Sequence, residues 1–260
     1  MTERSAQFSP YCGPPVGPDE IWRAWNFDPV LLFVLAVVAI RYTTVGAWLT
    51  RRQRCSFYFG WALLSFALVS PICNLGVSLF SAREGQHMLM TLIAAPLLVC
   101  GKVEVVAPRF VVRRIFDRVD PVVASFTYAA LLWLWHVPAL YESTFRSSIT
   151  YWAMHGSLMV ASLFLWRGIL SAREGTFQAP AAALLSLGQM SALGAALVLS
   201  GRPFYAAHVH SAQIWGMSAL EDQQLAGILM WVPACTVFIA ATLWTFSRSL
   251  AFFAPRRLAA

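Results

Sequence analysis

The feature that most constrains this chain is a series of apolar blocks, each roughly 20 residues long, with charged residues gathered in the connections between them. A helix of that length crosses the hydrocarbon core of a bilayer. We predict spans at about 29–50, 57–80, 86–106, 121–141, 151–170, 180–200 and 220–246. The chain is therefore expected to be all-α, a polytopic transmembrane bundle of seven helices.

Composition excludes an ordinary soluble domain. Hydrophobic residues make up 58% of the chain and charged residues only 12%, whereas soluble proteins carry about 25% charged residues. The net charge of +7 does not indicate a nucleic-acid partner, because the charges lie between the apolar blocks and follow membrane topology instead. The expected partner of this surface is the lipid bilayer.

The distribution of Lys and Arg predicts the orientation. Connections on one side carry thirteen of these residues and connections on the other side carry five, with Arg41 left out because it lies inside the first span. The basic side of a membrane protein faces the cytoplasm. We therefore expect an outer N-terminus and a cytoplasmic C-terminus.

This topology divides the chain into an irregular extracytoplasmic arm at 1–28, a seven-helix domain at 29–250 and a short basic cytoplasmic tail at 251–260. The arm is rich in Pro and Gly and lacks the apolar core of a cleavable signal peptide. The five cysteines show no paired spacing, so neither a disulfide framework nor a zinc ribbon is predicted. Cys73 is interpreted as a small buried residue for which a ligand role stays open.

All five histidines fall on the predicted outer side. Three lie near the outer ends of different spans, and two lie in the outer loop before the last span. Polar groups within a bundle tend to face its interior or a cavity. Imidazole is the commonest side-chain metal ligand, and imidazole with thioether suits copper better than magnesium or calcium. The candidate metal ligands are His87, His136, His155, His208, His210 and Met88.

Each of these assignments has a structural alternative. One interfacial histidine is as readily an anchor or a hydrogen-bonded group as a ligand, and His208 with His210 is also typical of a solvated loop pair. Trp133, Trp135 and Tyr141 are interpreted as part of the aromatic belt at the membrane surface.

The stretch "EDQQLAGILMWVP", which begins at Glu221, places four polar residues directly before the last apolar block. Ser218 and Glu221 match a capping box, and Asp222 lies in the first turn, where the helix dipole favours a negative charge. Capping does not explain Gln223 and Gln224. We interpret the four residues as the floor of an outer-facing polar vestibule, whose amides hold neighbouring groups or a partner segment rather than bind metal.

Four stretches occur in order along the chain: "WNFDPVLLF" at 25–33, "QHMLMTLIAAPLLVCG" at 86–101, "WLWHVPALYE" at 133–142 and "EDQQLAGILMWVP" at 221–233. Together they resemble the CtaG family of bacterial cytochrome c oxidase assembly factors, the integral membrane family with seven spans. The resemblance implies a non-enzymatic protein of the bacterial cytoplasmic (inner) membrane that assists copper delivery or insertion at the outer face. Copper is the implied cofactor, and oxidase subunits or other copper-delivery proteins are the implied partners.

The resemblance carries over to His87, His136 and His155 and to the polar residues that open the last span. Many members have a second histidine one turn before the histidines that match His87 and His155, whereas this chain has Arg83 and Tyr151 at those positions. An arginine cannot ligate a metal. The metal site is therefore expected to have fewer ligands than in relatives, to be completed by the two loop histidines, or to be lost.

Two other functions stay open. One is a membrane haem protein that uses two of the histidines as axial ligands near the outer face. The other is a small-solute transporter, although transporters usually place their sites on broken helices at the midplane, where ionisable residues are nearly absent here apart from Arg41. No nucleophile–base pair or phosphate-binding loop indicates an enzyme.

Overall fold

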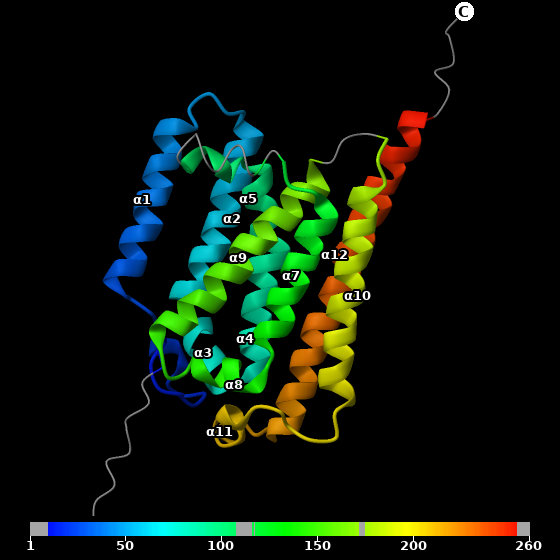
Figure 1. Ribbon diagram of the computed structural model, residues 1–260. Coiled ribbons are helices and arrows are strands. Elements are labelled where there is room, and N and C mark those ends of the chain that lie inside the picture. The colour runs from blue at the N-terminus through cyan, green and yellow to red at the C-terminus, as the bar shows by residue number, and fades with distance from the viewer. Residues whose placement is uncertain (1–9, 108–115, 117, 172–174, 254–260) are drawn as a thin grey trace, which may run out of the picture.

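The structure is all-helical, as predicted. The computed structural model describes residues 10–107, 116, 118–171 and 175–253, and within these ranges it contains helices but no strand. The long helices lie side by side (Figure 1). The α-helices are α1 (Pro29–Val45), α2 (Arg51–Val69), α3 (Ile72–Ser78), α4 (Phe80–Met88), α5 (Ala95–Cys100), α7 (Pro121–Trp135), α8 (Pro138–Ser143), α9 (Ser148–Leu170), α10 (Gln178–Leu199), α11 (Ser211–Ile214) and α12 (Ala219–Phe253). A π-helix, η2 (Leu89–Ala94), joins α4 to α5, and η1 (Ile21–Arg23), η3 (Val103–Val106) and η4 (Ala206–His208) are single 3-10 turns.

Membrane-spanning helices are present, but only some of the predicted spans meet the requirement by themselves. Helices α9, α10 and α12 are each long and apolar enough to cross a membrane, and α2 with α3 makes a fourth candidate bent by 46°. Helices α1 and α7 are apolar but shorter. The third predicted span is divided among α4, η2 and α5. Among the described residues, three or four of the seven predicted spans are therefore long and apolar enough to cross a membrane.

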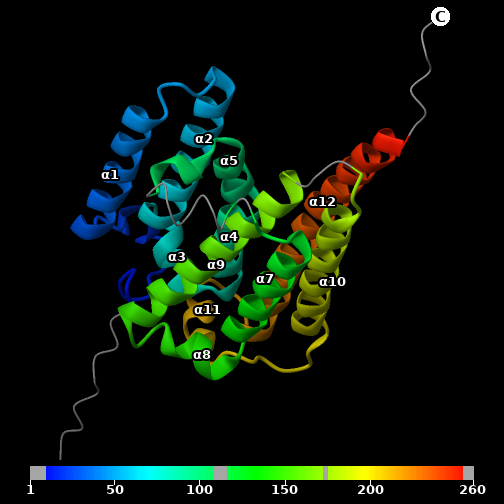
Figure 2. The ribbon, with the colours of Figure 1, turned by 45° about the horizontal axis from the view of Figure 1, so that its top comes forward.

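The helices form a layer with two distinct edges. Helices α1 and α2 lie at one edge and α10 and α12 at the other, with α4, α7 and α9 between them (Figure 2). Helices α10 and α12 approach closely because glycines face each other: a Cβ at Gly227 would meet the carbonyl oxygen of Gly194 at 2.7 Å. Small residues at a helix interface permit this contact of backbones.

Helix α4 begins earlier than the sequence suggests. The predicted third span starts at residue 86, whereas α4 starts at Phe80. His87 therefore lies two turns inside its helix, about 10 Å from the first residue, instead of at the outer end. The π-helix follows directly, and π-helical turns are frequent at functional sites. The indole N–H of Trp166 donates to the Thr91 carbonyl at 2.8 Å and ties α9 to this turn.

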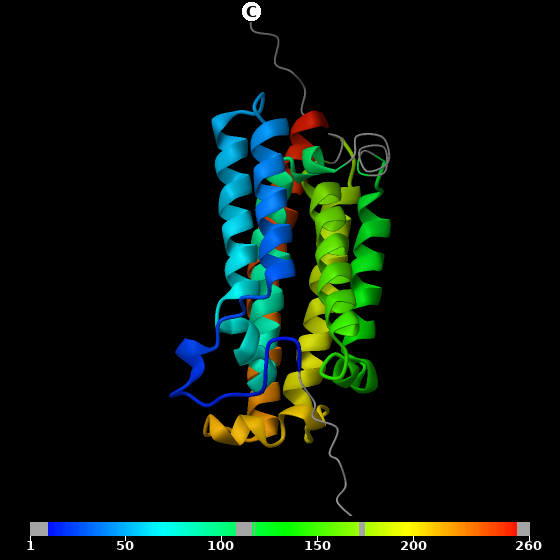
Figure 3. The same cartoon turned by 90° about the vertical axis from the view of Figure 1, so that its left-hand side faces the viewer.

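The two ends of the bundle differ in character. The arm and α11 lie at one end, and the α1–α2 connection and the end of α12 lie at the other (Figure 3). Helix α2 begins with Arg51 and Arg52, which places these charges at the end opposite the arm. Of the other basic residues counted for orientation, those at 4, 109, 113, 114, 173, 256 and 257 lie outside the described residues.

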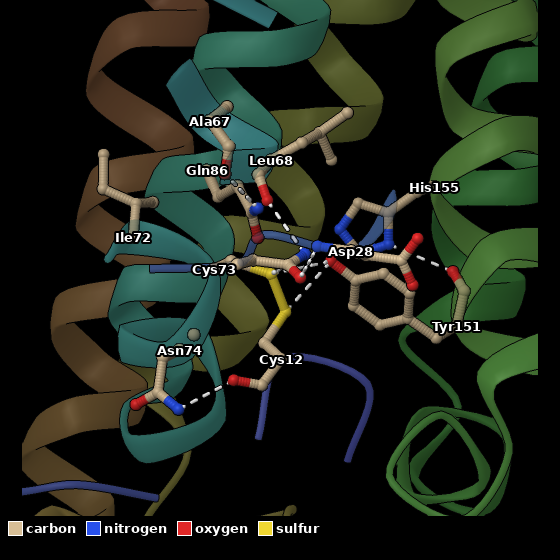
Figure 4. The surroundings of a disulfide bond; sticks show 12 residues. Cys12, Asp28, Ala67, Leu68, Ile72, Cys73, Asn74, Gln86, Tyr151 and His155 are labelled. Carbon is tan, nitrogen blue, oxygen red and sulfur yellow. Dashed lines mark hydrogen bonds between the residues drawn. A yellow bond between two sulfur atoms is a disulfide. The ribbon is translucent and has the colours of Figure 1, made fainter. Parts of the chain in front are cut away.

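The arm contains a disulfide, and the prediction of no disulfide was wrong. Cys12 and Cys73 are bonded across 61 residues, with their Cα atoms 5.6 Å apart (Figure 4). The amide of Asn74 donates to the carbonyl oxygens of Cys12 at 2.9 Å and Pro14 at 2.8 Å. The spacing of the cysteines in the sequence could not predict this disulfide, because the arm must first fold back along α3 to bring the two sulfur atoms together.

We predict that the disulfide stabilises the arm end of the bundle. Replacing both partners (Cys12→Ser with Cys73→Ser) should lower the free energy of unfolding by about 2–4 kcal/mol, because the bond closes a long loop in the unfolded chain. Thermal unfolding in detergent measures the change, with the exposed free Cys55→Ser as control. A thiol reductant should lower the midpoint of the wild type but leave that of the double variant unchanged. An equal response of the two proteins would contradict a stabilising role.

Candidate functional site

The centre of the site is a cluster of one carboxylate and three imidazoles buried between α4, α7 and α9. Glu84 and His87 lie one turn apart on α4, His136 is the C-cap of α7, and His155 lies two turns inside α9. All four side chains are buried. The structure thus brings together three of the predicted ligands and adds a carboxylate that the sequence analysis did not single out.

Glu84 connects two of the imidazoles. Its Oε1 lies 3.4 Å from Nδ1 of His87, and its Oε2 lies 3.4 Å from Nε2 of His136. The third imidazole, His155, faces His87 with 5.0 Å between ring centroids. A buried carboxylate is costly unless a cation or hydrogen-bond donors compensate it. An ionised Glu84 therefore requires positive charge, supplied by protons on the imidazoles or by a bound cation.

The backbone sets the tautomer of two rings. Nδ1 of His136 lies 2.7 Å from the Leu132 carbonyl oxygen, and Nδ1 of His155 lies 3.1 Å from the Tyr151 carbonyl oxygen. A carbonyl oxygen can only accept a hydrogen bond, so each Nδ1 carries a proton and donates. In the neutral rings each Nε2 then presents a lone pair. Metal-binding histidines are held in the same way, with the second ring nitrogen bonded to a carbonyl or carboxylate.

Several polar atoms of the cluster have no hydrogen-bond partner among the described residues. They are Oε2 of Glu84, Nδ1 and Nε2 of His87, Nε2 of His136 and Nε2 of His155. Unsatisfied buried groups are rare in native proteins and call for a specific explanation, such as a bound ion. In this conformation, however, no three His, Cys, Asp or Glu side chains in the described part of the chain converge on one point that could hold a metal. The donor set suits a metal ion, but at most two ligands meet it at once.

Arg83 and Tyr151, at the two positions where relatives often have histidine, form a structural layer on the arm side of the cluster. The guanidinium of Arg83 lies 5.8 Å from the centre of the Tyr151 ring and 4.6 Å from that of Phe145. Its Nε donates to the Gly76 carbonyl oxygen at 2.9 Å. The Tyr151 hydroxyl in turn lies 3.4 Å from the sulfur of Cys12 (Figure 4). These residues cover the cluster instead of extending it.

His208, one of the predicted ligands, lies outside the group formed by Glu84 and the three imidazoles and makes structural contacts. Its Nε2 lies 2.7 Å from the Tyr141 hydroxyl, and its Nδ1 lies 3.4 Å from the Ser78 carbonyl oxygen, so both ring nitrogens are engaged. The same contact shows that Tyr141 is buried and is not part of a surface aromatic belt. Burial, with the positive charge of Arg83 as a second cause, lowers the pKa of His208 to about 3.

The two remaining predicted ligands lie apart from the cluster. His210 is exposed and precedes α11. Met88 packs in the hydrophobic core next to Met90 and Leu92 on the helix that carries His87. Neither contributes to the group formed by Glu84 and the three imidazoles.

The polar residues at the start of α12 make structural contacts. Ser218 and Glu221 form the predicted capping box: the Ser218 amide donates to Oε2 of Glu221 at 2.8 Å, and the Glu221 amide donates to Oγ of Ser218 at 3.2 Å. The Gln223 side chain accepts from the Phe204 amide at 2.6 Å and so holds the α10–α12 loop. Gln224 is half-buried and makes no side-chain hydrogen bond with the described residues. In the segment predicted as a vestibule floor, Gln223 thus holds the adjoining loop in place.

Asp222 acts on another helix. Its carboxylate is buried and accepts from the Phe80 amide at 2.7 Å and from the Ser81 amide at 3.0 Å, the first two residues of α4. Leu79, the residue that precedes α4, provides no side-chain cap. Asp222 therefore caps α4 from α12, whereas the sequence analysis assigned it to the dipole of its own helix and to the vestibule floor.

Glu84 is the one member of the cluster that the sequence did not lead us to expect. Its spacing of i, i+3 from His87 on one helix is the spacing that places a carboxylate and an imidazole of a metal site on one face. The predicted third span begins only at residue 86, which leaves residue 84 in a polar connection. Only the early start of α4 turns this connection into a buried helical turn.

Comparison with known proteins points to one family. The family model described as cytochrome c oxidase caa3 assembly factor (Caa3_CtaG) matches residues 31–251. That match begins within the first turn of α1 and ends within the last turn of α12, and all five histidines lie within it. No curated protein and no solved structure is significantly similar to the chain.

We predict that Asp222 is required for the stability of α4. Asp222→Ala leaves two buried amides without an acceptor and should cost about 2 kcal/mol or more of unfolding free energy. Ser218→Ala, which removes the exposed cap of α12, should cost about 1 kcal/mol. Thermal unfolding midpoints of the two variants test the ranking. The interpretation of Asp222 as the cap of α4 is wrong if Asp222→Ala is the milder change.

We predict a loss of stability on acidification that depends on His208. The folded state holds this ring neutral, whereas the unfolded chain protonates it below about pH 6.5. Stability is therefore complete above pH 6.5 and falls by about 1.4 kcal/mol for each pH unit between 6.5 and 3. Thermal unfolding at pH 7.0 and 5.5 measures this slope. A His208→Gln variant should be less stable at pH 7.0 and show a shallower slope, and an unchanged slope would contradict the assignment.

Proposed function

Because the chain belongs to the family of caa3-type cytochrome c oxidase assembly factors, we propose that it holds copper briefly at one end of its bundle and passes it to the oxidase. Copper is the cargo of this step rather than a resident cofactor. Glu84, His87, His136 and His155 are the residues that would hold it. The observation that carries the proposal is the group of buried, unpartnered nitrogen and oxygen atoms that these four side chains direct at one another.

The low number of converging ligands suits delivery. Ligands of a bound metal ion stand about 2.0–2.2 Å from it, so the two 3.4 Å pairs around Glu84 could each share one ion. A third ligand requires a side chain to move, because no three converge in this conformation of the described residues. A carrier with two ligands gives up its metal to an acceptor that offers more. Imidazole is among the ligands that suit copper, and mixed nitrogen and oxygen ligation is typical of Cu(II).

The proposed topology has seven spans in the bacterial cytoplasmic membrane, with the histidine end outside. Its support is the separation of charge and histidine along the bundle. The arm and the histidine cluster share one end, and α2 starts with arginines at the other. A cytoplasmic basic end follows from the positive-inside rule. Oxidase subunits or copper-carrying proteins would then meet the chain on the outer side, and the role requires no enzymatic activity.

Deletion of the chain in its host is the direct test of the assembly role. We expect lower oxidase activity and less copper in the isolated oxidase, and both should return when the wild-type chain is supplied again. A deletion strain whose oxidase holds normal copper and full activity would refute the role. Excess copper in the medium that restores activity would favour copper supply over a scaffolding role.

We predict that copper retention depends on the buried cluster and not on the loop. His87→Ala and Glu84→Gln should each weaken copper binding by about 10–100-fold, the range expected when a group that holds or supports a ligand is removed. His210→Ala, an exposed histidine outside the cluster, is the matched control and should bind like the wild type. Copper content after dialysis against a chelator under reducing conditions is the measurement. Equal loss in all three variants, or a copper-free wild type, would refute this site.

A further inference from the structure

A groove opens on the side of the bundle between α1 and α9. It has a volume of about 500 Å³, within the ~300–1,000 Å³ range of small-molecule sites. Residues of α1, α2, η2, α9 and the arm line it: Tyr11, Asp28, Val30, Leu31, Val34, Leu35, Trp61, Leu64, Leu68, Met90, Trp152, His155, Gly156 and Met159. None of the cluster residues other than His155 is among them. The groove is therefore a second site that adjoins the histidine cluster through one ring.

Contacts at two levels hold α1 away from α9 and define the groove. At the arm end, Asn26 donates its amide side chain to the Leu68 carbonyl oxygen at 3.2 Å and its backbone amide to that of Val69 at 2.9 Å. Further in, the Trp61 indole N–H donates to the Leu35 carbonyl oxygen at 3.2 Å. The groove occupies the turns of α1 between these contacts, and Trp61 forms its inner end.

The lining changes from polar to apolar along the groove. Its polar members are Asp28 at the start of α1, Tyr11 of the arm and His155 on α9, and the residues further in are aliphatic, aromatic or thioether side chains. No lysine or arginine lines it. The carboxylate of Asp28 and the unpartnered Nε2 of His155 are acceptors, so the polar end suits a head that donates hydrogen bonds and disfavours a bare anion.

We propose that the groove binds a membrane amphiphile with one long apolar chain and a hydroxyl-bearing head. The chain would lie along α1 and α9 toward Trp61, and the hydroxyl would donate to acceptors at the Asp28–His155 end. This polarity matches a bilayer leaflet, whose polar surface is at the arm end and whose hydrocarbon lies further in. The groove and the cluster share one residue, His155, whereas Asp28, Tyr11 and the aliphatic lining take no part in the cluster.

Gly156 provides a sharp test. A Cβ at this position meets no atom within 4 Å, so a side chain can be added here, and Gly156→Leu should occupy part of the groove. Gly188 on α10 is the matched control, because it too is a helical glycine with no atom within 4 Å of an added Cβ, and it lies outside the groove. Val34→Trp fills the groove from the α1 side and replaces Gly156→Leu if that variant does not fold.

The measurement is native mass spectrometry of the full chain with cetyl alcohol and its methyl ether, which cannot donate a hydrogen bond. We expect the wild type and Gly188→Leu to retain one cetyl alcohol per chain, and Gly156→Leu to bind it at least tenfold more weakly. The ether should bind about three- to tenfold more weakly than the alcohol. Equal retention by wild type and Gly156→Leu would overturn the site. Equal binding of alcohol and ether, or preferential retention of a two-chain phospholipid, would overturn the proposed head chemistry.

Discussion

The interaction on which the site depends is the contact of the Asp222 carboxylate with the first two amides of α4. It fixes the residue at which α4 starts, and the start decides how deep Glu84 and His87 lie. If α4 began where the apolar block begins, at residue 86, Glu84 would lie in a solvated connection and His87 in the first turn of the helix at the surface. The cap comes from α12, so the last helix of the chain sets the position of functional groups on a helix near residue 80.

Successive layers protect the cluster on its arm side. Arg83, held between aromatic rings, lies next to the cluster on α4, and Tyr151 lies one turn before His155 on α9. Beyond Tyr151 is the Cys12–Cys73 disulfide, which joins the arm to α3. A cation–aromatic contact and a covalent bond thus separate the cluster from the surface on this side.

His155 links the two sites described here. Its Nδ1 is held by the backbone of its own helix, and its ring contacts His87 on one side and the groove beside α1 on the other. Occupation of the groove would therefore change the surroundings of one imidazole of the cluster. Met90, which lines the groove, lies in the π-helix that follows α4, the helix of His87. The groove and the cluster are therefore also connected along the chain.

The sequence by itself determined the all-helical membrane class, the helix starts at Asp28 and Ser218, the family, and three of the four cluster residues. These follow from local patterns: apolar length, capping chemistry and one-sided histidines. Tertiary structure alone decided the role of Glu84, the buried and engaged state of His208, the reach of Asp222 to α4 and the pairing of Cys12 with Cys73. Each of these joins residues that are distant in sequence, or depends on where a helix begins, and burial then decides whether a polar group is solvated, bonded or left to bind something else.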